Sequence, residues 1–260
     1  MNKLEDQVKM VARQMGAHLV GIADAAHLPD QAPAIATLLP GARRLVVVAT
    51  GHNRVALRSA DNEARQFDTI HTYDEAARAA HAVARFLDAV GHAAIAVPAF
   101  IPLDMAPPKK GMRGAVDWRR AAYWAGLGSK GENGLLVTRD WGSAVRLCGV
   151  VTQAALAPDG PLAEDVCDHC GNCLTACPPG ALGAEGAIDK KKCGDHIFRY
   201  GFRAFQGLMA GLFDRQAPAK AAIEGVALRE LWQNFMTGNY YYCFACQTQC
   251  HGGGDSAPKG

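Results

Sequence analysis

The sequence lacks long hydrophobic runs, blocks of like charge and a leader of any familiar type. No apolar stretch reaches the ~18 residues that a membrane-spanning helix needs. The opening residues "MNKLEDQVKM" mix acidic and apolar side chains, unlike a secretory signal peptide or a twin-arginine leader. The formal net charge is only +2, and no basic block indicates a partner with a phosphate backbone. We therefore expect a cytoplasmic protein with no membrane partner.

What the sequence does have is apolar content and cysteine. Its 260 residues are 49% hydrophobic, enough to bury the core of one large domain or two modest ones. It contains nine cysteines. In a chain with no expected export signal, cysteines serve metal or redox chemistry more often than disulfides, because cytosolic thiols are kept reduced.

The pattern of apolar residues predicts a mixture of helices and strands upstream of the cysteines. Helical spacing indicates helices over residues 3–15 and from Tyr73 to Val90, the second ending before Gly91. Short apolar runs indicate strands over residues 18–23, 43–50, 93–100, 134–138 and 144–152. The composition changes near residue 160, so we expect two domains, 1–160 and 161–260.

The first cysteine motif is specific for an iron–sulfur cluster. Cys167, Cys170, Cys173 and Cys177, followed at once by Pro178, fit the spacing C-x2-C-x2-C-x3-C-P. In bacterial ferredoxins the first three thiolates of this run hold one [4Fe-4S] cluster and the fourth binds a second cluster. The alternative is a zinc site, but structural zinc prefers two separated C-x2-C pairs.

A count of ligands then predicts two complete clusters. By the same crossover, Cys250 of the tail motif C-x2-C-x3-C returns to the first cluster, and Cys243 and Cys246 join the second. The second cluster still needs one thiolate, which is either Cys193 or Cys148. We assign Cys193, which lies between the motifs, because Cys148 sits inside an apolar run and resembles a small buried hydrophobe. The predicted ligands are Cys167, Cys170, Cys173 and Cys250 for one cluster, and Cys177, Cys193, Cys243 and Cys246 for the other.

This order of cysteines resembles that of the epoxyqueuosine reductases and the related reductive dehalogenases. The upstream segments "GAHLVGIA", "LLPGARRLVVVAT" and "AGLGSKGENGLLVTRDWGSAVRLCGVVT" are also similar to that family. The resemblance implies an α+β fold with a nitroreductase-like three-layer core and a C-terminal ferredoxin-like module holding two clusters. It also implies a cobalamin, to which the clusters pass electrons for reductive chemistry performed by the cofactor.

The resemblance suggests two catalytic residues. Asp104 in "PLDMAP" matches the aspartate that supplies the acid in the epoxyqueuosine enzymes. Tyr73 corresponds to the tyrosine of a Tyr-His pair near the start of a helix in that family, although Asp74 replaces the histidine here. A turn aspartate and a packed tyrosine are the structural alternatives for these two residues.

A glycine-rich segment is a further candidate for cofactor binding. "GLGSKGENG" could cradle a phosphate, or the nucleotide tail of a corrinoid, with backbone amides and a lysine. It is not a true phosphate-binding loop motif, and a glycine-rich hairpin is the alternative. The candidate residues are Gly126, Gly128, Lys130, Gly131 and Asn133.

The sequence also suggests what the reductase acts on. The chain stops soon after Cys250, where long members of the family continue into a helical-repeat domain used toward tRNA. We therefore expect a short form that reduces a small molecule rather than tRNA, with a ferredoxin or flavodoxin as electron donor; a homodimer is compatible with the sequence. The alternatives are an electron-transfer or corrinoid-reducing protein without its own substrate, or a flavin-type reductase.

Overall fold

The computed structural model describes residues 3–97, 114–198, 202–213, 226–237 and 243–252. Its main sheet is antiparallel and has the strand order β1-β2-β6-β3. The two central strands are eight residues long and rich in valine, a residue that packs well on a pleated surface. The bounds of the strands are β1 Leu19–Asp24, β2 Arg44–Gly51, β3 Ala94–Val97 and β6 Val145–Thr152. The predicted strands 18–23, 43–50 and 144–152 are therefore confirmed.

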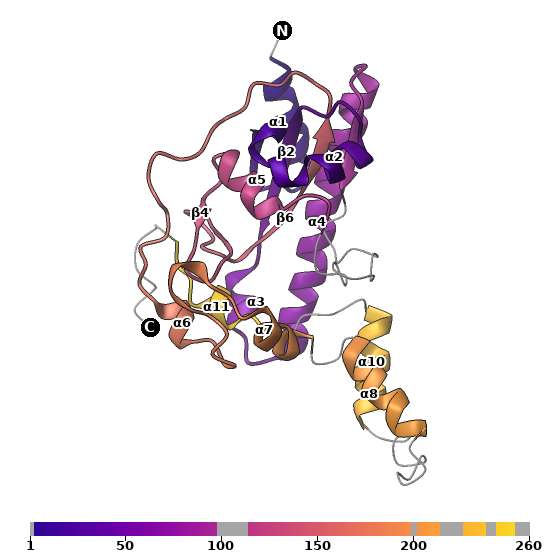
Figure 1. Cartoon of the computed structure of the whole chain (residues 1–260), viewed down its shortest axis with the longest axis vertical. Coiled ribbons are helices and arrows are strands. Elements are labelled where there is room, and N and C mark those ends of the chain that lie inside the picture. Colours follow the sequence, from indigo (N-terminus) through magenta and orange to yellow (C-terminus); the bar gives the residue numbers. More distant parts are fainter. Residues whose placement is uncertain (1–2, 98–113, 199–201, 214–225, 238–242, 253–260) are drawn as a thin grey trace.

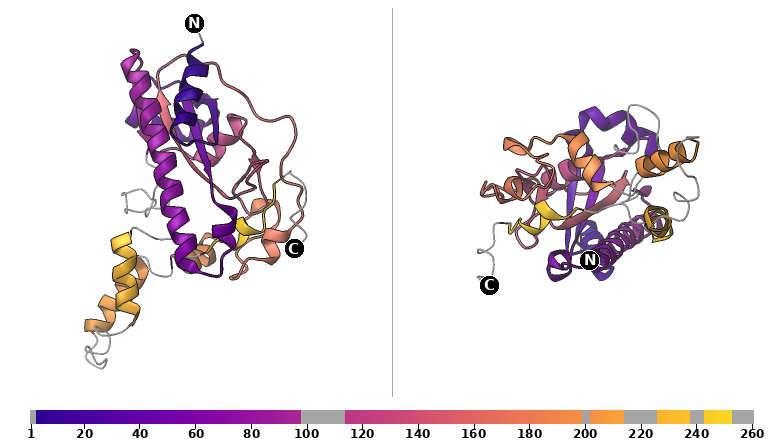
Figure 2. Two further views of the ribbon diagram at one scale, coloured as in Figure 1. Left: turned by 180° about the vertical axis from the view of Figure 1, so that it is seen from behind. Right: turned by 90° about the horizontal axis from the view of Figure 1, so that it is seen from below.

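Helices cover both faces of this sheet (Figures 1 and 2). Side chains alternate along β2, so Val46 and Val48 pack beneath helices α1 and α4, while Leu45 and Val47 pack beneath α2 and α5 on the other face. The helix bounds are α1 Leu4–Gln14, α2 Ala32–Leu38, α4 Asn62–Ala89 and α5 Trp118–Trp124. The fold is thus a mixture of helix and sheet, as the sequence predicted.

Helix α4 is much longer than the sequence indicated. It begins at Asn62, where the Asp61 side chain accepts a hydrogen bond from the Glu63 backbone amide, and it does not begin at Tyr73. The predicted helix covers only the alanine-rich C-terminal half, which packs on the apolar part of the sheet. The first half buries polar side chains such as Gln66, and this hides the apolar spacing that marks a helix in sequence.

The cysteine segments lie beside one end of the sheet (Figure 1). A two-stranded ribbon of β4 and β5 leads into them, and helix α11 contacts both α6 and α3, which brings the tail motif to the first motif. The bounds of these elements are α3 Arg54–Arg58, β4 Ser129–Lys130, β5 Leu136–Val137, α6 Asn172–Thr175, α7 Lys190–Ile197 and α11 Ala245–Thr248. The described ranges also contain the single 3₁₀ turns η1 Ala25–His27, η2 Pro29–Gln31 and η3 Ala184–Gly186.

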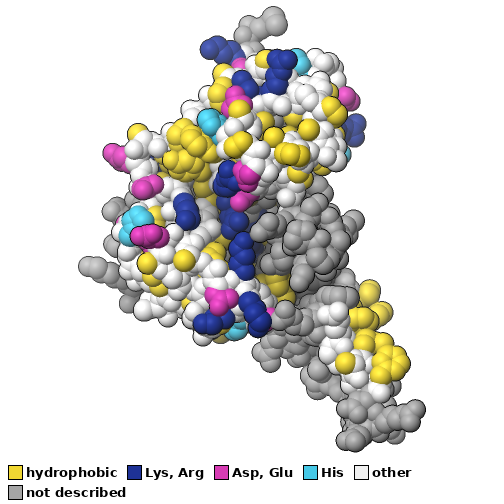
Figure 3. Space-filling view, viewed as in Figure 1, with side chains coloured by type: hydrophobic (Ala, Val, Ile, Leu, Met, Phe, Trp, Pro, Cys, Tyr) yellow, Lys and Arg dark blue, Asp and Glu magenta, His cyan; other side chains and the backbone are white. Residues whose placement is uncertain are grey.

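Two further helices project from the body as a pair (Figures 1 and 2). They are α8 (Phe202–Phe213) and α10 (Val226–Thr237), which touch through an edge-to-face contact of Phe205 with Phe235. Hydrophobic side chains gather on their surface, among them the exposed Trp232 (Figure 3). None of the helices in the described ranges is long and apolar enough to cross a membrane.

Candidate metal centre

Four thiols from the two ends of the cysteine region surround one small pocket. Cys167, Cys170, Cys173 and Cys250 all line it. Burial raises the pKa of the Cys173 thiol, and the neighbouring thiols of Cys250, Cys167 and Cys170 raise it further. The structure therefore brings the first three cysteines of the leading motif together with the last cysteine of the chain.

Local hydrogen bonds hold this loop in place. The hydroxyl of Ser129, on strand β4, accepts hydrogen bonds from the backbone amides of Val166 and Cys167 at 2.9 and 3.2 Å. The Asp168 carboxylate accepts one from the Cys170 amide at 3.2 Å. Gly171 has a φ of 73°, a left-handed conformation that glycine adopts without strain, and it leads the chain into α6. Hydrogen bonds of the protein itself therefore anchor the loop to the β4–β5 ribbon.

The other four cysteines of the two motifs and α7 form a second group. The pKa of Cys246 is raised to about 12 by burial and by the thiols of Cys243, Cys193, Cys173 and Cys177. Burial and the thiols of Cys243 and Cys177 likewise raise the pKa of Cys193. Crowded thiols with raised pKa values resist ionisation unless a cation compensates the charge, so this group needs a metal to hold four thiolates.

Cys148 lies apart from both groups. It sits on β6 in the hydrophobic core, is 1% exposed, and its S–H donates to the Val97 carbonyl at 3.2 Å. Burial raises its pKa to about 12. The donor set is therefore two groups of four thiols, which fits two [4Fe-4S] clusters. The assignment of each ligand stays a prediction until iron is counted in variants.

Two histidine–carboxylate pairs flank the first group. His169 lies with its Nδ1 2.6 Å from Glu132, and the Nε2 atom of His251 lies 3.7 Å from Asp168. The ligand atoms of Asp168, Cys170 and His251 lie within 4.8 Å of one another. These pairs place charge beside the first group, where hydrogen bonds and charge tune a cluster.

The glycine-rich segment makes internal contacts. Lys130 donates from Nζ to the Glu185 carbonyl at 2.9 Å, and Asn133 donates from Nδ2 to the Ser143 hydroxyl at 2.8 Å. A Cβ atom at Gly128 would lie 2.1 Å from the Val137 carbonyl oxygen, so close packing of the ribbon requires glycine there. Binding of a cofactor by Gly126, Gly128, Lys130, Gly131 and Asn133 stays a prediction.

The two predicted catalytic residues have different outcomes. Asp104 lies outside the described residues. Tyr73 lies on α4, partly buried, with the Arg146 guanidinium 4.8 Å from the centre of its ring. This cation–π contact fixes the ring beside a positive charge.

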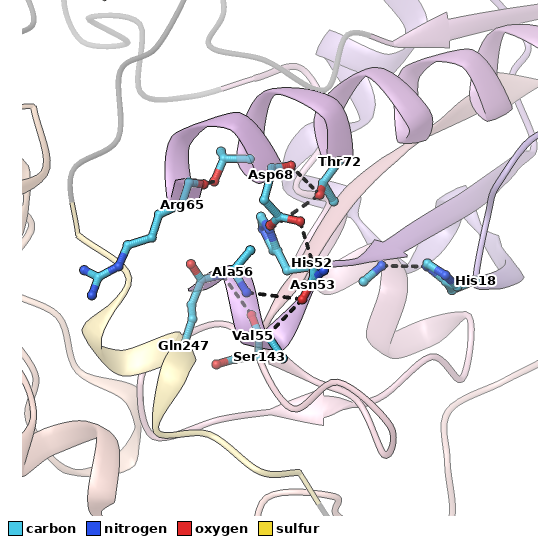
Figure 4. Close-up of polar contacts among 12 residues, drawn as sticks. His18, His52, Asn53, Val55, Ala56, Arg65, Asp68, Thr72, Ser143 and Gln247 are labelled. Carbon is cyan, nitrogen blue, oxygen red and sulfur yellow. Dashed lines mark hydrogen bonds and ion pairs between the residues drawn. The ribbon is translucent and has the colours of Figure 1, made fainter. Parts of the chain in front are cut away.

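Sequence reasoning missed a buried histidine–aspartate pair (Figure 4). His52 follows β2 directly, is 2% exposed, and its Nδ1 lies 2.5 Å from the Asp68 carboxylate on α4. The same carboxylate accepts from the Asn53 amide at 3.0 Å, and the Thr72 hydroxyl donates to the Asp68 carbonyl at 2.7 Å. Nothing in "ATGHNRV" distinguishes this histidine from a surface residue. Its partner, Asp68, lies in the first half of α4, which the sequence did not predict as a helix.

The pKa of His52 is lowered. Burial is the largest cause and the Arg146 charge adds to it, while the hydrogen bond to Asp68 opposes the shift. The imidazole is therefore neutral at neutral pH, with Nδ1–H donating to Asp68. This tautomer leaves Nε2 as an acceptor, and Nε2 is buried with no hydrogen-bond partner among the described residues.

We expect acid to destabilise the protein through this histidine. Because its folded pKa lies below the unfolded value of about 6.5, its contribution to stability is complete above that pH and is lost as the pH falls below it. The loss can reach about 1.4 kcal/mol per pH unit. Chemical unfolding at pH 7.5, 6.5 and 5.5 should show a smaller loss of unfolding free energy in His52→Gln than in the wild type. An identical pH dependence would contradict a buried neutral His52.

The known proteins that the chain resembles include epoxyqueuosine reductases and a reductive dehalogenase. No protein-family model matches the chain. An epoxyqueuosine reductase of Listeria monocytogenes is 44% identical over 69 residues, which are 26% of this chain and 18% of that protein. An epoxyqueuosine reductase of Gloeobacter violaceus is 29% identical over 214 residues, 72% of this chain and 63% of that protein. The chain thus spans less than two thirds of these relatives.

Solved structures share the fold. An epoxyqueuosine reductase bound to an epoxyqueuosine-modified tRNA stem loop aligns with a TM-score of 0.59 at 20% identity, over 95% of this chain and 64% of that one. A reductive dehalogenase whose structure suggests a mechanism for B12-dependent dehalogenation aligns with a TM-score of 0.57 at 16% identity, over 89% of this chain and 36% of that one. The predicted resemblance to these two groups is confirmed, and the relatives' names agree with the predicted oxidoreductase class.

One prediction is overturned. The sequence led us to expect a small-molecule substrate and to argue against tRNA. The curated relatives are epoxyqueuosine reductases, and one solved neighbour holds a modified tRNA stem loop. The expectation of a small-molecule substrate and no tRNA was therefore wrong, because the length of a chain does not determine the chemistry of its site.

Proposed function

We propose, starting from this similarity to epoxyqueuosine reductases, that the chain is an iron–sulfur, corrinoid-dependent reductase acting on a modified nucleoside of tRNA. The observation that carries the proposal is the gathering of eight thiols into two groups of four beside a sheet whose fold the reductases share. A zinc protein would need four such ligands, and a simple ferredoxin would not need the covered sheet.

The exposure of the two groups suggests the direction of electron flow. Cys170 of the first group is exposed, whereas each of the four thiols of the second group is at least partly buried. Electrons from a reductant would therefore enter at the first cluster and pass to the second, which lies next to α3 and the sheet. We retain the division into 1–160 and 161–260 as part of this proposal.

Buried polar atoms on β2 and α4 fit a polar cofactor. The Thr50 hydroxyl, and both side-chain polar atoms of Gln66, are buried with no hydrogen-bond partner among the described residues. Burying such groups unpaired costs about 1–3 kcal/mol each, so they suit a ligand that carries amides, as a corrinoid does. A bound corrinoid would supply the low-potential cobalt chemistry of the reduction. The roles of Thr50 and Gln66 would be to orient it.

The reaction itself needs protons as well as electrons. Opening an epoxide to an alkene removes its oxygen as water and takes two electrons and two protons. Asp104 and Tyr73 remain the proposed donors, and the Arg146 guanidinium lies over the Tyr73 ring and holds it in place.

The test is conversion of a defined substrate. The anaerobic protein, loaded with iron and cobalamin and reduced with dithionite, is incubated with tRNA that carries epoxyqueuosine, and the nucleosides are analysed by mass spectrometry. We expect loss of one oxygen from the modified nucleoside, and no conversion by a Cys246→Ser control. Full metal content without conversion would contradict the proposed substrate; uptake of iron without cobalamin would contradict the proposed cofactor.

A further inference from the structure

The interface between α4 and the sheet changes from apolar to polar along β2. Val46, Val48, Thr50 and His52 alternate onto the same face of the strand, the one that α4 covers. The first two pack in the hydrophobic core, whereas Thr50 is 0% and His52 is 2% exposed and both hold buried polar atoms. This polar end leads into α3, which contacts α11, the helix that carries Cys246 (Figure 4).

The geometry of His52 is that of a proton acceptor. The Asp68 carboxylate accepts a hydrogen bond from Nδ1–H, which fixes the ring and leaves the lone pair of Nε2 without a donor among the described residues. A structural contact alone would need only the Nδ1 side of the ring. A buried acceptor without a donor costs stability, so its retention indicates a use.

The charges around His52 determine when it can take a proton. On α4 it faces the Asp68 carboxylate, which stabilises an imidazolium; from β6 the Arg146 charge opposes one; both act in addition to burial. The β2–α3 turn contributes the Asn53 amide, which shares the Asp68 carboxylate. The balance favours the neutral ring, and a new negative charge nearby would reverse it.

The second cysteine group is placed to provide that charge. Helix α3, which begins two residues after His52, packs Leu57 against Phe244 in a small buried cluster, and Phe244 is the neighbour of Cys243. Burial raises the pKa of Cys243, and the charge of Arg65, one turn before Asp68 on α4, opposes that shift. The same two elements therefore contact both the histidine pair and this group.

We propose that His52 takes up a proton at Nε2 when the cluster held by Cys177, Cys193, Cys243 and Cys246 is reduced. The step is balanced: an external reductant gives one electron to the cluster, and solvent gives one proton to the imidazole, whose charge Asp68 compensates. The stored proton is then available to the reduction, which consumes protons. This inference rests on the proposed function, since it requires that cluster.

The test is a potentiometric titration of the iron-loaded protein, followed by EPR, at several pH values from about 5.5 to 8.5, the range in which histidine titrates. The second cluster is recognised as the signal that Cys193→Ser lacks. Its midpoint potential should become more negative as the pH rises, with a slope approaching the 59 mV that corresponds to a tenfold change for one electron. His52→Gln should show no slope, and the control His81→Gln, an exposed histidine of α4, should keep it.

A second variant covers the case in which His52→Gln does not hold iron. Asp68→Asn keeps the imidazole but removes the charge that compensates the imidazolium, so the region of pH dependence should move to lower pH. A flat wild-type potential, a wild-type slope in His52→Gln, or an unmoved region in Asp68→Asn would each overturn the inference. Absence of iron from the wild type would instead overturn the proposed function, and this inference with it.

Discussion

Replacing Cys193 by serine is expected to remove one whole cluster and leave the other. About four of about eight irons should be lost, because the variant removes one of the four thiolates assigned to that cluster. The expectation rests on the placement of Cys193 on α7, where the thiols of Cys243 and Cys177 raise its pKa together with burial. Iron per chain and the EPR spectrum of the reduced protein measure the outcome.

The matched control is Cys148→Ser. This residue lies in the sheet core, where its S–H donates to Val97, and neither thiol group contains it. The variant should retain all of its iron and lose only folding stability, because a hydroxyl replaces a buried thiol. Loss of a cluster in Cys148→Ser together with retention in Cys193→Ser would show that the eighth ligand was assigned to the wrong cysteine.

Adding one methyl group at Gly142 is expected to remove the other cluster. This residue has a φ of 55°, and a Cβ atom there would lie 2.3 Å from the Cys250 carbonyl oxygen and 3.1 Å from its sulfur. The turn cannot move away, because Gly142 and Thr138 exchange backbone hydrogen bonds of 2.8 and 3.0 Å. Gly142→Ala must therefore displace Cys250, and we expect loss of about four irons with the EPR signal of the second cluster intact.

A control separates this clash from the cost of the backbone conformation. Gly91 also has a positive φ, 87°, but a Cβ atom there meets no atom within 4 Å. Gly91→Ala should lower stability by about 1 kcal/mol, as for other residues forced into that region, and keep all of the iron. Full iron content in Gly142→Ala would mean that Cys250 does not belong to the first group.

The sequence predicted those features whose signal is local. Strand β2 is a continuous apolar run and could be read directly. The spacing C-x2-C-x2-C-x3-C-P predicts its ligands in the same local way, and that assignment stays a prediction. The pairing of Cys250 with the leading motif followed from ligand count, and the structure places Cys250 beside Cys173.

Features that depend on contacts between distant segments were missed. The first half of α4 has polar side chains on its buried side, such as Gln66 and Thr69, so no apolar period marks it. His52 can be recognised as a buried hydrogen-bonded residue only from its contact with Asp68, which lies 16 positions away in the first half of α4. The expectation of a small-molecule substrate failed for a different reason. It rested on the length of the chain, which carries no information about the geometry or charge of the site.

The central claim, two four-iron clusters serving a corrinoid, is tested most directly by anaerobic purification with cobalamin supplied, followed by iron and cobalt analysis with an optical spectrum. The account predicts about eight irons and about one cobalt per chain. About four irons, or eight irons with no cobalt and no uptake of cobalamin, would contradict it.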